Sequence, residues 1–337
     1  MVRYMRLFRS KKKSDIPEWG LSSTKGPVGL KVLHDSPNAD LDIIFIHGLT
    51  CNRTKTWTHQ NGTFWPKDLL ANDIPQARIM TFGYELDLLN FTSTSTSTSK
   101  SATNRLHDTA QSLSYALVSQ RIDCPTRPIM FIAHGLGGLI CQQVFILSNS
   151  VDGLWAISSS AIGVIFMGTP HYGSSLAHYG EKLANCVRAK GDVMHVGALD
   201  LDLGSDDLQC IAGEFQGMLS RGELVVNVLC FYEMEGVNDV VGKIVEQEEA
   251  VLRGCESFGV RGDHCGMVRF EGFADEGYCT VTDVVRRWIR ELDDGNGLVV
   301  DKSAAGPGAG SPGLPVGGPA WLESWTPGNY FWGRDRD

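Results

Sequence analysis

Three features are missing from the sequence, and each absence excludes a class of protein. There is no excess of positive charge, because 39 Asp and Glu outnumber 30 Lys and Arg and give a net charge of -9. This argues against non-specific nucleic-acid binding, which needs Lys and Arg to neutralise phosphates. The nine cysteines form no C-x-x-C pair, a pattern that fits free thiols better than a disulfide framework or a zinc site. We therefore expect neither a metal nor a cofactor.

A long uninterrupted apolar run is also missing. The most apolar window, residues 128–147, contains His134, Gln142, Gln143 and three glycines, which would be costly in a lipid core. The sequence predicts no transmembrane helix. The first 13 residues carry six positive charges and no acid. They fit a mitochondrial-type leader, a basic segment that touches a membrane surface, or a disordered basic start.

Between residues 28 and 294, short β-rich runs alternate with helical patterns. This alternation predicts an α/β fold with a mostly parallel central sheet and helices on both faces. Continuous apolar runs such as residues 43–46 indicate strands that are buried on both sides. The expected strands are 41–46, 77–84, 128–133, 161–167 and 224–232, and the expected helices are 104–121, 139–147 and 280–292.

Two segments fall outside the expected domain of residues 28–294. Residues 1–27 form the basic N-terminus, and 295–337 form a tail in which Gly and Pro dominate as far as residue 319. Within the domain, residues 92–101 contain an unbroken Thr-Ser repeat that predicts a flexible loop, since it can bury little apolar surface. The aromatic stretch 321–332 is either a docking peptide or a loose end.

Residues 131–138, Phe-Ile-Ala-His-Gly-Leu-Gly-Gly, predict a sharp turn from a buried strand into a helix. Enzymes that act through an acyl-enzyme present a nucleophilic serine at such a turn, flanked by small residues that let the backbone pass close to its neighbours. Here Ala133, Gly137 and Gly138 are small, but Gly135 stands at the nucleophile's own position. The position of the nucleophile is therefore vacant.

An oxyanion hole in this architecture takes one backbone N–H from the residue after the nucleophile and one from a loop after an early strand. His47 and Gly48 follow the expected strand 41–46. The sequence thus predicts the amides of Leu49 and Leu136 as the donors, in a pocket that includes His47, Gly48 and His134.

A catalytic base of this type is a histidine in a loop late in the chain, and His264 has that placement. The matching acid follows the penultimate strand, which favours Glu233 and leaves Glu235, Asp239 and Glu246 as alternatives. We expect His264 to lie about 3 to 4 Å from a carboxylate and to face Gly135.

Two further residues lie close to these motifs in the sequence. His171 follows the expected strand 161–167 and either lines the pocket or stabilises the turn. Cys141 lies inside the expected helix, away from the turn, so we interpret it as a buried thiol and not as a substitute nucleophile.

Several blocks of the sequence, taken in order, resemble the serine active site-containing, lipase-like α/β-hydrolases, whose fungal members often form the leading domain of NACHT or NB-ARC signalling proteins. The resemblance covers about residues 28–292 and implies an α/β-hydrolase fold with His264 as base, Glu233 as acid, and Leu49 and Leu136 as oxyanion donors. It also implies association with mitochondrial and endoplasmic-reticulum membranes. The blocks are residues 42–49, 56–57, 64–70, 78–84, 132–139, 163–173 and 263–264.

Two functional hypotheses follow from the glycine at position 135. The first is a non-catalytic module that binds an ester, a lipid or a signalling protein. The second is a carboxylic ester hydrolase with a residual rate, since removing one triad member leaves about 10³-fold catalysis over water. One codon change separates Gly from Ser, so a sequence error at this codon is a third reading. With the rest of the site in place, Gly135→Ser should restore labelling by a fluorophosphonate probe.

The predicted boundaries can be tested by limited proteolysis. Brief digestion should cut first within residues 92–101 and after residue 294, because a polar repeat and a Gly/Pro-rich tail cannot protect their backbone by packing. Mass spectrometry of the fragments locates the cuts. First cuts inside the predicted strands would contradict the boundaries.

Overall fold

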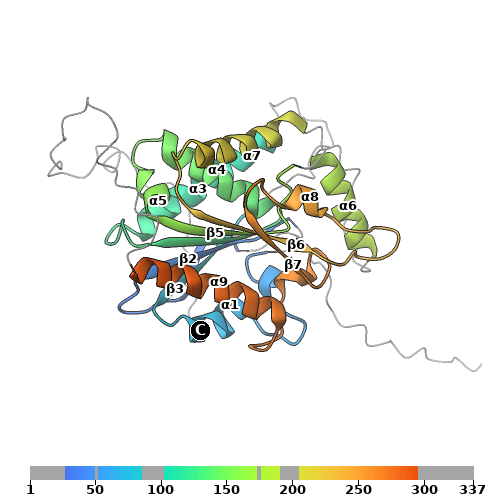
Figure 1. The fold of residues 1–337 in the computed structure, drawn as a ribbon, viewed down its shortest axis with the longest axis horizontal. Helices are drawn as coiled ribbons and strands as arrows, with labels where there is room; N and C mark the ends of the chain where they lie inside the picture. The colour runs from blue at the N-terminus through green and yellow to red at the C-terminus, as the bar shows by residue number, and fades with distance from the viewer. Residues whose placement is uncertain (1–26, 50–51, 86–101, 173–175, 190–204, 295–337) are drawn as a thin grey trace, which may run out of the picture. The chain divides into compact units, whose positions relative to one another are not determined.

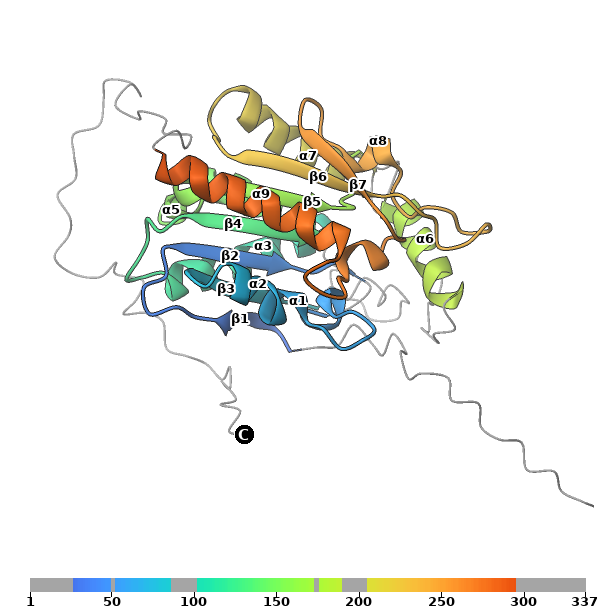
Figure 2. The ribbon, with the colours of Figure 1, turned by 60° about the horizontal axis from the view of Figure 1, so that its bottom comes forward.

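A seven-stranded sheet forms the centre of the structure, with strand order β1-β3-β2-β4-β5-β6-β7 (Figures 1 and 2). The computed structural model describes residues 27–49, 52–85, 102–172, 176–189 and 205–294. The strands are β1 (Gly29–His34), β2 (Leu41–Ile46), β3 (Ala77–Gly83), β4 (Ile129–His134), β5 (Ala161–Met167), β6 (Asn227–Glu233) and β7 (Glu256–Val260). Apart from Pro27, the segments predicted at 1–27, 92–101 and 295–337 lie outside the described residues and remain predictions.

All the strand pairs except one are parallel. β1 runs antiparallel to β3, and β2 pairs in parallel with both β3 and β4, so that Ile43 lies between Ile79 and Met130. Every residue of β2, β3 and β4 is buried. Strands of this kind need a helical layer on each face.

Two hydrophobic clusters cover the two faces of the sheet. On one face pack α3 (Ala102–Gln120), α4 (Leu136–Ser150) and α7 (Ser205–Ser220), through residues such as Leu113, Ile140 and Phe215. The other face is covered by α9 (Glu276–Asp293) with the short helices α1 (Trp65–Asp68) and α2 (Leu70–Asp73). The predicted fold class, a mostly parallel sheet with helices on both faces, is confirmed.

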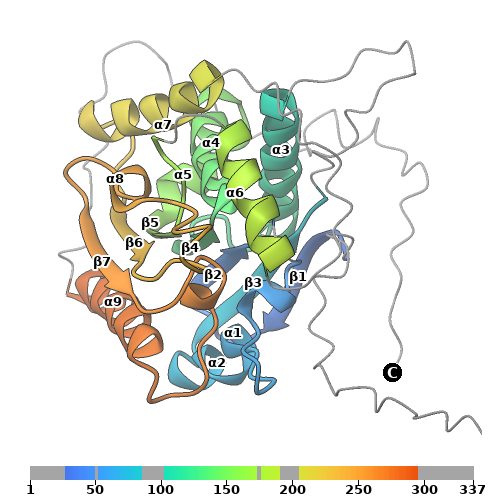
Figure 3. The ribbon, with the colours of Figure 1, turned by 90° about the vertical axis from the view of Figure 1, so that its right-hand side faces the viewer.

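The carboxyl ends of the parallel strands meet at one edge of the sheet. This edge brings together the loops after β2, β4, β5, β6 and β7, which contain the candidate site residues. Two helices, α6 (Leu176–Ala189) and α8 (Gln247–Ala250), lie at the same edge (Figure 3). The remaining described elements are α5 (Trp155–Ser160) and the 3₁₀ turns η1 (Lys55–Trp57) and η2 (Gly266–Val268).

The structure differs from the sequence prediction in several elements. β1, β7, α6 and α7 were not predicted, and α4 begins at Leu136, three residues before the expected start at 139. The earlier start matters for the site, because only residue 135 separates the end of β4 at His134 from the first turn of α4. In the part of the chain that the structure describes, no helix is both long enough and apolar enough to span a bilayer.

A buried carboxylate fixes the start of β2. Asp42 is fully buried and pairs with three arginines, Arg78, Arg121 and Arg127. Arg78 is bidentate, since its Nε and Nη2 donate to the two carboxylate oxygens at 2.8 and 2.9 Å. Because Arg121 follows α3 and Arg127 precedes β4, this single carboxylate connects four segments at the edge opposite the site.

Asp42→Asn should lower the free energy of unfolding by about 3 to 5 kcal/mol, because it leaves buried guanidinium groups without their counter-charge. Asp40→Asn, at an exposed position two residues away, is the matched control and should change stability little. Urea denaturation of the three proteins measures the difference. Equal stability of the two variants would contradict the role given to Asp42.

Candidate functional site

The turn between β4 and α4 has a backbone conformation that favours glycine. Gly135 is the N-cap residue of α4 with φ 53° and ψ -128°, and its N–H donates to the Met167 carbonyl at 3.0 Å. A positive φ is costly for residues that carry a Cβ. Gly137 lies so close to β2 that a Cβ there would stand 2.4 Å from the His47 carbonyl oxygen. The turn is therefore packed directly against the end of β2.

His264 and Glu233 lie together beneath this turn. The His264 Nδ1 atom is 3.4 Å from Glu233 Oε1, and both side chains are fully buried. The two groups do not meet the geometry of a hydrogen bond, so their attraction is mainly electrostatic. Glu233 Oε1 also accepts the Val245 N–H at 2.7 Å. On its other side, His264 Nε2 is 3.3 Å from where a Cβ on residue 135 would stand.

The three alternative acids lie elsewhere. Glu235 and Asp239 are exposed, and Glu246 caps the N-terminus of α8 and pairs with Lys182 at 3.8 Å. Of the four carboxylates considered from the sequence, Glu233 is the one that the structure places beside His264.

The charge on His264 depends on two opposing effects. Burial is the largest single effect and disfavours the imidazolium, but the Glu233 carboxylate, together with Cys265 and Asp263, favours it, so the pKa of His264 is raised above its ordinary value. In a catalytic triad, the acid is a buried carboxylate that orients the imidazole and stabilises its protonated form. The contact between Glu233 and His264 is of this kind.

His47 and His134 hold the loops around the site in position. His47 Nδ1 bonds to the Gly48 carbonyl at 2.6 Å, and its ring stacks on Tyr84. His134 Nε2 bonds to the His264 carbonyl at 2.8 Å. Burial is the main reason that the pKa of His47 falls to about 4 and that of His134 falls well below its usual range. Both imidazoles are therefore neutral near pH 7, and their contacts serve to position the loops.

The loop predicted to supply an oxyanion donor lies beside the turn. The Gly48 Cα is 3.8 Å from the position that a Cβ on residue 135 would take, and Leu49 is the next residue along. Leu136 is the first residue of α4, so its amide is one of those left without a partner inside the helix. The structure thus brings the loop at 47–49 and the start of α4 to one place.

Sequence reasoning missed a residue that the structure places at the centre of the site. Tyr179 of α6 is 4% exposed, and its hydroxyl lies 3.2 Å from His264 Nε2. The same oxygen is 2.8 Å from where a Cβ on residue 135 would stand. The backbone of Leu136 acts on the pKa of this hydroxyl, so the start of α4 lies close to it. A tyrosine in a helix carries no motif, so only the fold could reveal this contact.

His171 and Cys141 lie apart from these groups. His171 Nδ1 is 2.9 Å from Gln142 Nε2, its ring packs edge-on against Phe166, and its backbone N–H donates to Glu249. These contacts favour the structural reading of His171 over the pocket reading. Cys141 is fully buried inside α4, where burial raises the pKa of its thiol well above the ordinary value. It is therefore no source of a thiolate.

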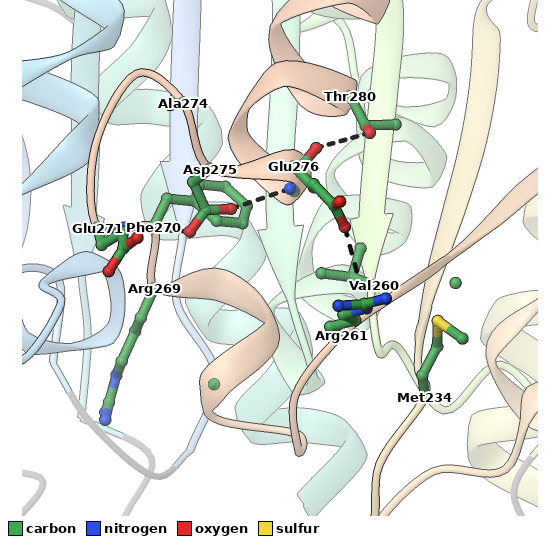
Figure 4. Close-up of a pocket in the computed structure, with 13 residues that line it drawn as sticks. Met234, Val260, Arg261, Arg269, Phe270, Glu271, Ala274, Asp275, Glu276 and Thr280 are labelled. Atoms are coloured by element: carbon green, nitrogen blue, oxygen red, sulfur yellow. Dashed lines mark hydrogen bonds and ion pairs between the residues drawn. The ribbon is translucent and has the colours of Figure 1, made fainter.

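A surface hollow of about 500 Å³ lies between β7 and the start of α9, lined by polar residues such as Arg261 and Glu276 (Figure 4). Neither His264 nor Glu233 lines it. Arg261 and Glu276 approach one another at 3.9 Å, and both are highly exposed. Within the described ranges, no cluster of His, Cys, Asp and Glu has an arrangement that could bind a metal ion.

Comparison with known proteins gives a match to part of the chain. No family model matches the chain. Protein SERAC1 of Homo sapiens is 29% identical over 171 residues, and the Mus musculus protein is 30% identical over 171 residues; each match covers 45% of this chain and 25% of the relative. The matched part is thus about a quarter of the length of these curated relatives.

Among solved structures, the lipase BlEst2 of Bacillus licheniformis in its mature form superposes with a TM-score of 0.50 at 16% identity, over 78% of this chain and 99% of that one. The chain has an α/β-hydrolase fold. At this level of identity the likeness concerns the fold, and the activity has to be argued from the site.

The buried histidines should make the protein sensitive to acid. Burial lowers the pKa of His171 to about 3, whereas an unfolded chain binds this proton near pH 6.5. Stability is therefore fully present above pH 6.5 and is lost as the pH falls below it. Between pH 7.5 and 5.5, His171 alone should cost about 1 kcal/mol. The raised pKa of His264 acts in the opposite direction, since it adds stability at low pH and loses it as the pH rises.

Urea denaturation at the two pH values should show a smaller loss of stability for His171→Gln than for the unmodified protein. His107→Gln, at a half-exposed position, is the control and should keep the original pH dependence. An unchanged pH dependence in His171→Gln would contradict the prediction.

Proposed function

We propose that this protein is a lipase- or esterase-like α/β-hydrolase domain that acts by binding and not by acyl transfer. The proposed domain spans residues 28–294, and its proposed partner is an ester, a lipid or a signalling protein. Acyl transfer by an α/β-hydrolase needs a nucleophilic oxygen or sulfur on the turn after β4. The observation that carries the proposal is the glycine at that point of the fold, with φ 53°.

The other residues of the site support the hydrolase ancestry of this proposal. His264 with Glu233 at 3.4 Å would act as the base and the acid, and the amides of Leu49 and Leu136 would act as oxyanion donors. The partial likeness to Protein SERAC1 agrees with a lipase-like domain. It extends over too little of those proteins to transfer an activity.

Residual ester hydrolysis is the alternative, because a base and an oxyanion hole without a nucleophile can still activate water. Burial weakens this alternative. His264 is 0% exposed and Glu233 is 1% exposed, so a water molecule would need a path that the described side chains do not provide.

Hydrolysis of p-nitrophenyl butyrate tests the proposal. The unmodified protein should hydrolyse the ester no faster than the His264→Gln variant, and neither should react with a fluorophosphonate probe, because no hydroxyl stands on the turn. A saturable activity that His264→Gln abolishes would contradict the proposal and favour the residual hydrolase.

A further inference from the structure

The hydroxyl of Tyr179 stands where the oxygen of a nucleophile would be needed. In a working triad, the nucleophile's hydroxyl donates to the ring nitrogen of the histidine that faces away from the acid. Here Glu233 lies on the Nδ1 side of His264 at 3.4 Å, and Tyr179 lies on the Nε2 side at 3.2 Å. The hydroxyl that contacts the histidine on the side away from the acid is thus supplied by α6 and not by the turn after β4.

The same oxygen interferes with any side chain at position 135. A Cβ added to Gly135 would stand 2.8 Å from the Tyr179 hydroxyl, whereas real Cβ atoms essentially never come closer than 3.0 Å to a neighbour. No other atom of Tyr179 comes closer to that point than 3.8 Å. The conflict is therefore confined to one oxygen atom, and the glycine and the tyrosine hydroxyl fit each other.

We propose that the Tyr179 hydroxyl is the internal ligand of this site, filling the space of the missing nucleophile and satisfying His264 in its place. The inference rests on the proposed function, because it assumes that residue 135 does no chemistry. It adds that the Tyr179 hydroxyl keeps the other side chains of the site in position. A buried imidazole nitrogen without a partner is unfavourable, and the Tyr179 hydroxyl removes that penalty.

A role for Tyr179 as a replacement nucleophile fits the geometry less well. Its oxygen lies close to the Leu136 backbone, where the substrate oxygen would have to bind. Burial, the largest cause, raises the pKa of Tyr179 well above its ordinary value, so the phenol stays protonated. Tyr179 is 4% exposed, so an acyl group on its oxygen would have to displace neighbouring side chains.

The proposal corrects the expectation that Gly135→Ser alone would create a reactive serine. The new Cβ would have to displace the Tyr179 hydroxyl, and the serine would compete with it for His264 Nε2. Removing the tyrosine oxygen first should open the position. In the reaction with a fluorophosphonate, the serine oxygen would then displace fluoride from phosphorus, and His264 would accept the serine proton.

Labelling of five proteins with a fluorophosphonate probe tests this. The unmodified chain and Gly135→Ser should label slowly or not at all, and Gly135→Ser combined with Tyr179→Phe or with Tyr179→Ala should label at least about tenfold faster than Gly135→Ser. The matched control is Gly135→Ser with Tyr172→Phe, which removes a hydroxyl that bonds to Gln216 instead of His264. It should label like Gly135→Ser.

The outcomes separate this inference from the proposed function. Labelling of the unmodified chain at Tyr179 would overturn both. Gly135→Ser that labels as fast as the double variants, or folded double variants that stay inert, would overturn the inference alone. Circular dichroism establishes that each variant is folded.

A second measurement does not depend on a serine. Tyr179→Ala leaves a space shaped for a phenol, so phenol should raise the melting temperature of this variant saturably, while benzene should raise it less because it cannot hydrogen-bond to His264. The unmodified protein should show neither effect. Equal effects of phenol and benzene, or no effect of phenol, would overturn the inference.

Discussion

The turn at residue 135 is the constraint on which the rest of the site depends. A positive φ directly after β4 sends the chain back as α4, and the turn must pass close enough to β2 that Gly137 leaves no room for a Cβ. An ordinary residue at 135 would cost about 1 to 3 kcal/mol in backbone strain. A nucleophilic residue would bear that strain because its side chain is needed for the reaction, whereas glycine adopts the conformation without strain. The geometry of the turn is therefore kept at no conformational cost.

Electrostatic contacts around this turn form one connected chain. Val245 donates to Glu233, Glu233 faces His264, and His264 faces Tyr179. The side chains of Glu233, His264 and Tyr179 are buried, so their polar groups need partners, and the loss of any one would leave its neighbour unsatisfied. A site without a nucleophile can hold a histidine and a carboxylate together for this reason alone. Retention of His264 and Glu233 is thus no evidence of turnover.

Much of the fold follows from local patterns in the sequence. β2 and β4 were predicted because each contains a continuous apolar run, and a doubly covered parallel strand leaves that signature. β7 was missed because it lies at the sheet edge, where Glu256 and Phe258 are exposed and the apolar run is broken. α7 carried a readable signal, since Ile211, Phe215 and Met218 recur at helical spacing.

Some residues of the site could likewise be predicted from the sequence, and others could not. His264 and Glu233 were identified because parallel strands end at one edge of a sheet, so residues after successive strands converge there. The position of Tyr179 could not be predicted, because it depends on how α6 packs over that edge and not on any local pattern.

An experimental structure of the unmodified protein, at a resolution that defines side-chain positions, tests the central claim most directly. The account predicts the Tyr179 hydroxyl within hydrogen-bonding distance of His264 Nε2, over a glycine with positive φ. A water molecule or ligand beside His264, with the Tyr179 ring turned away from it, would contradict the account.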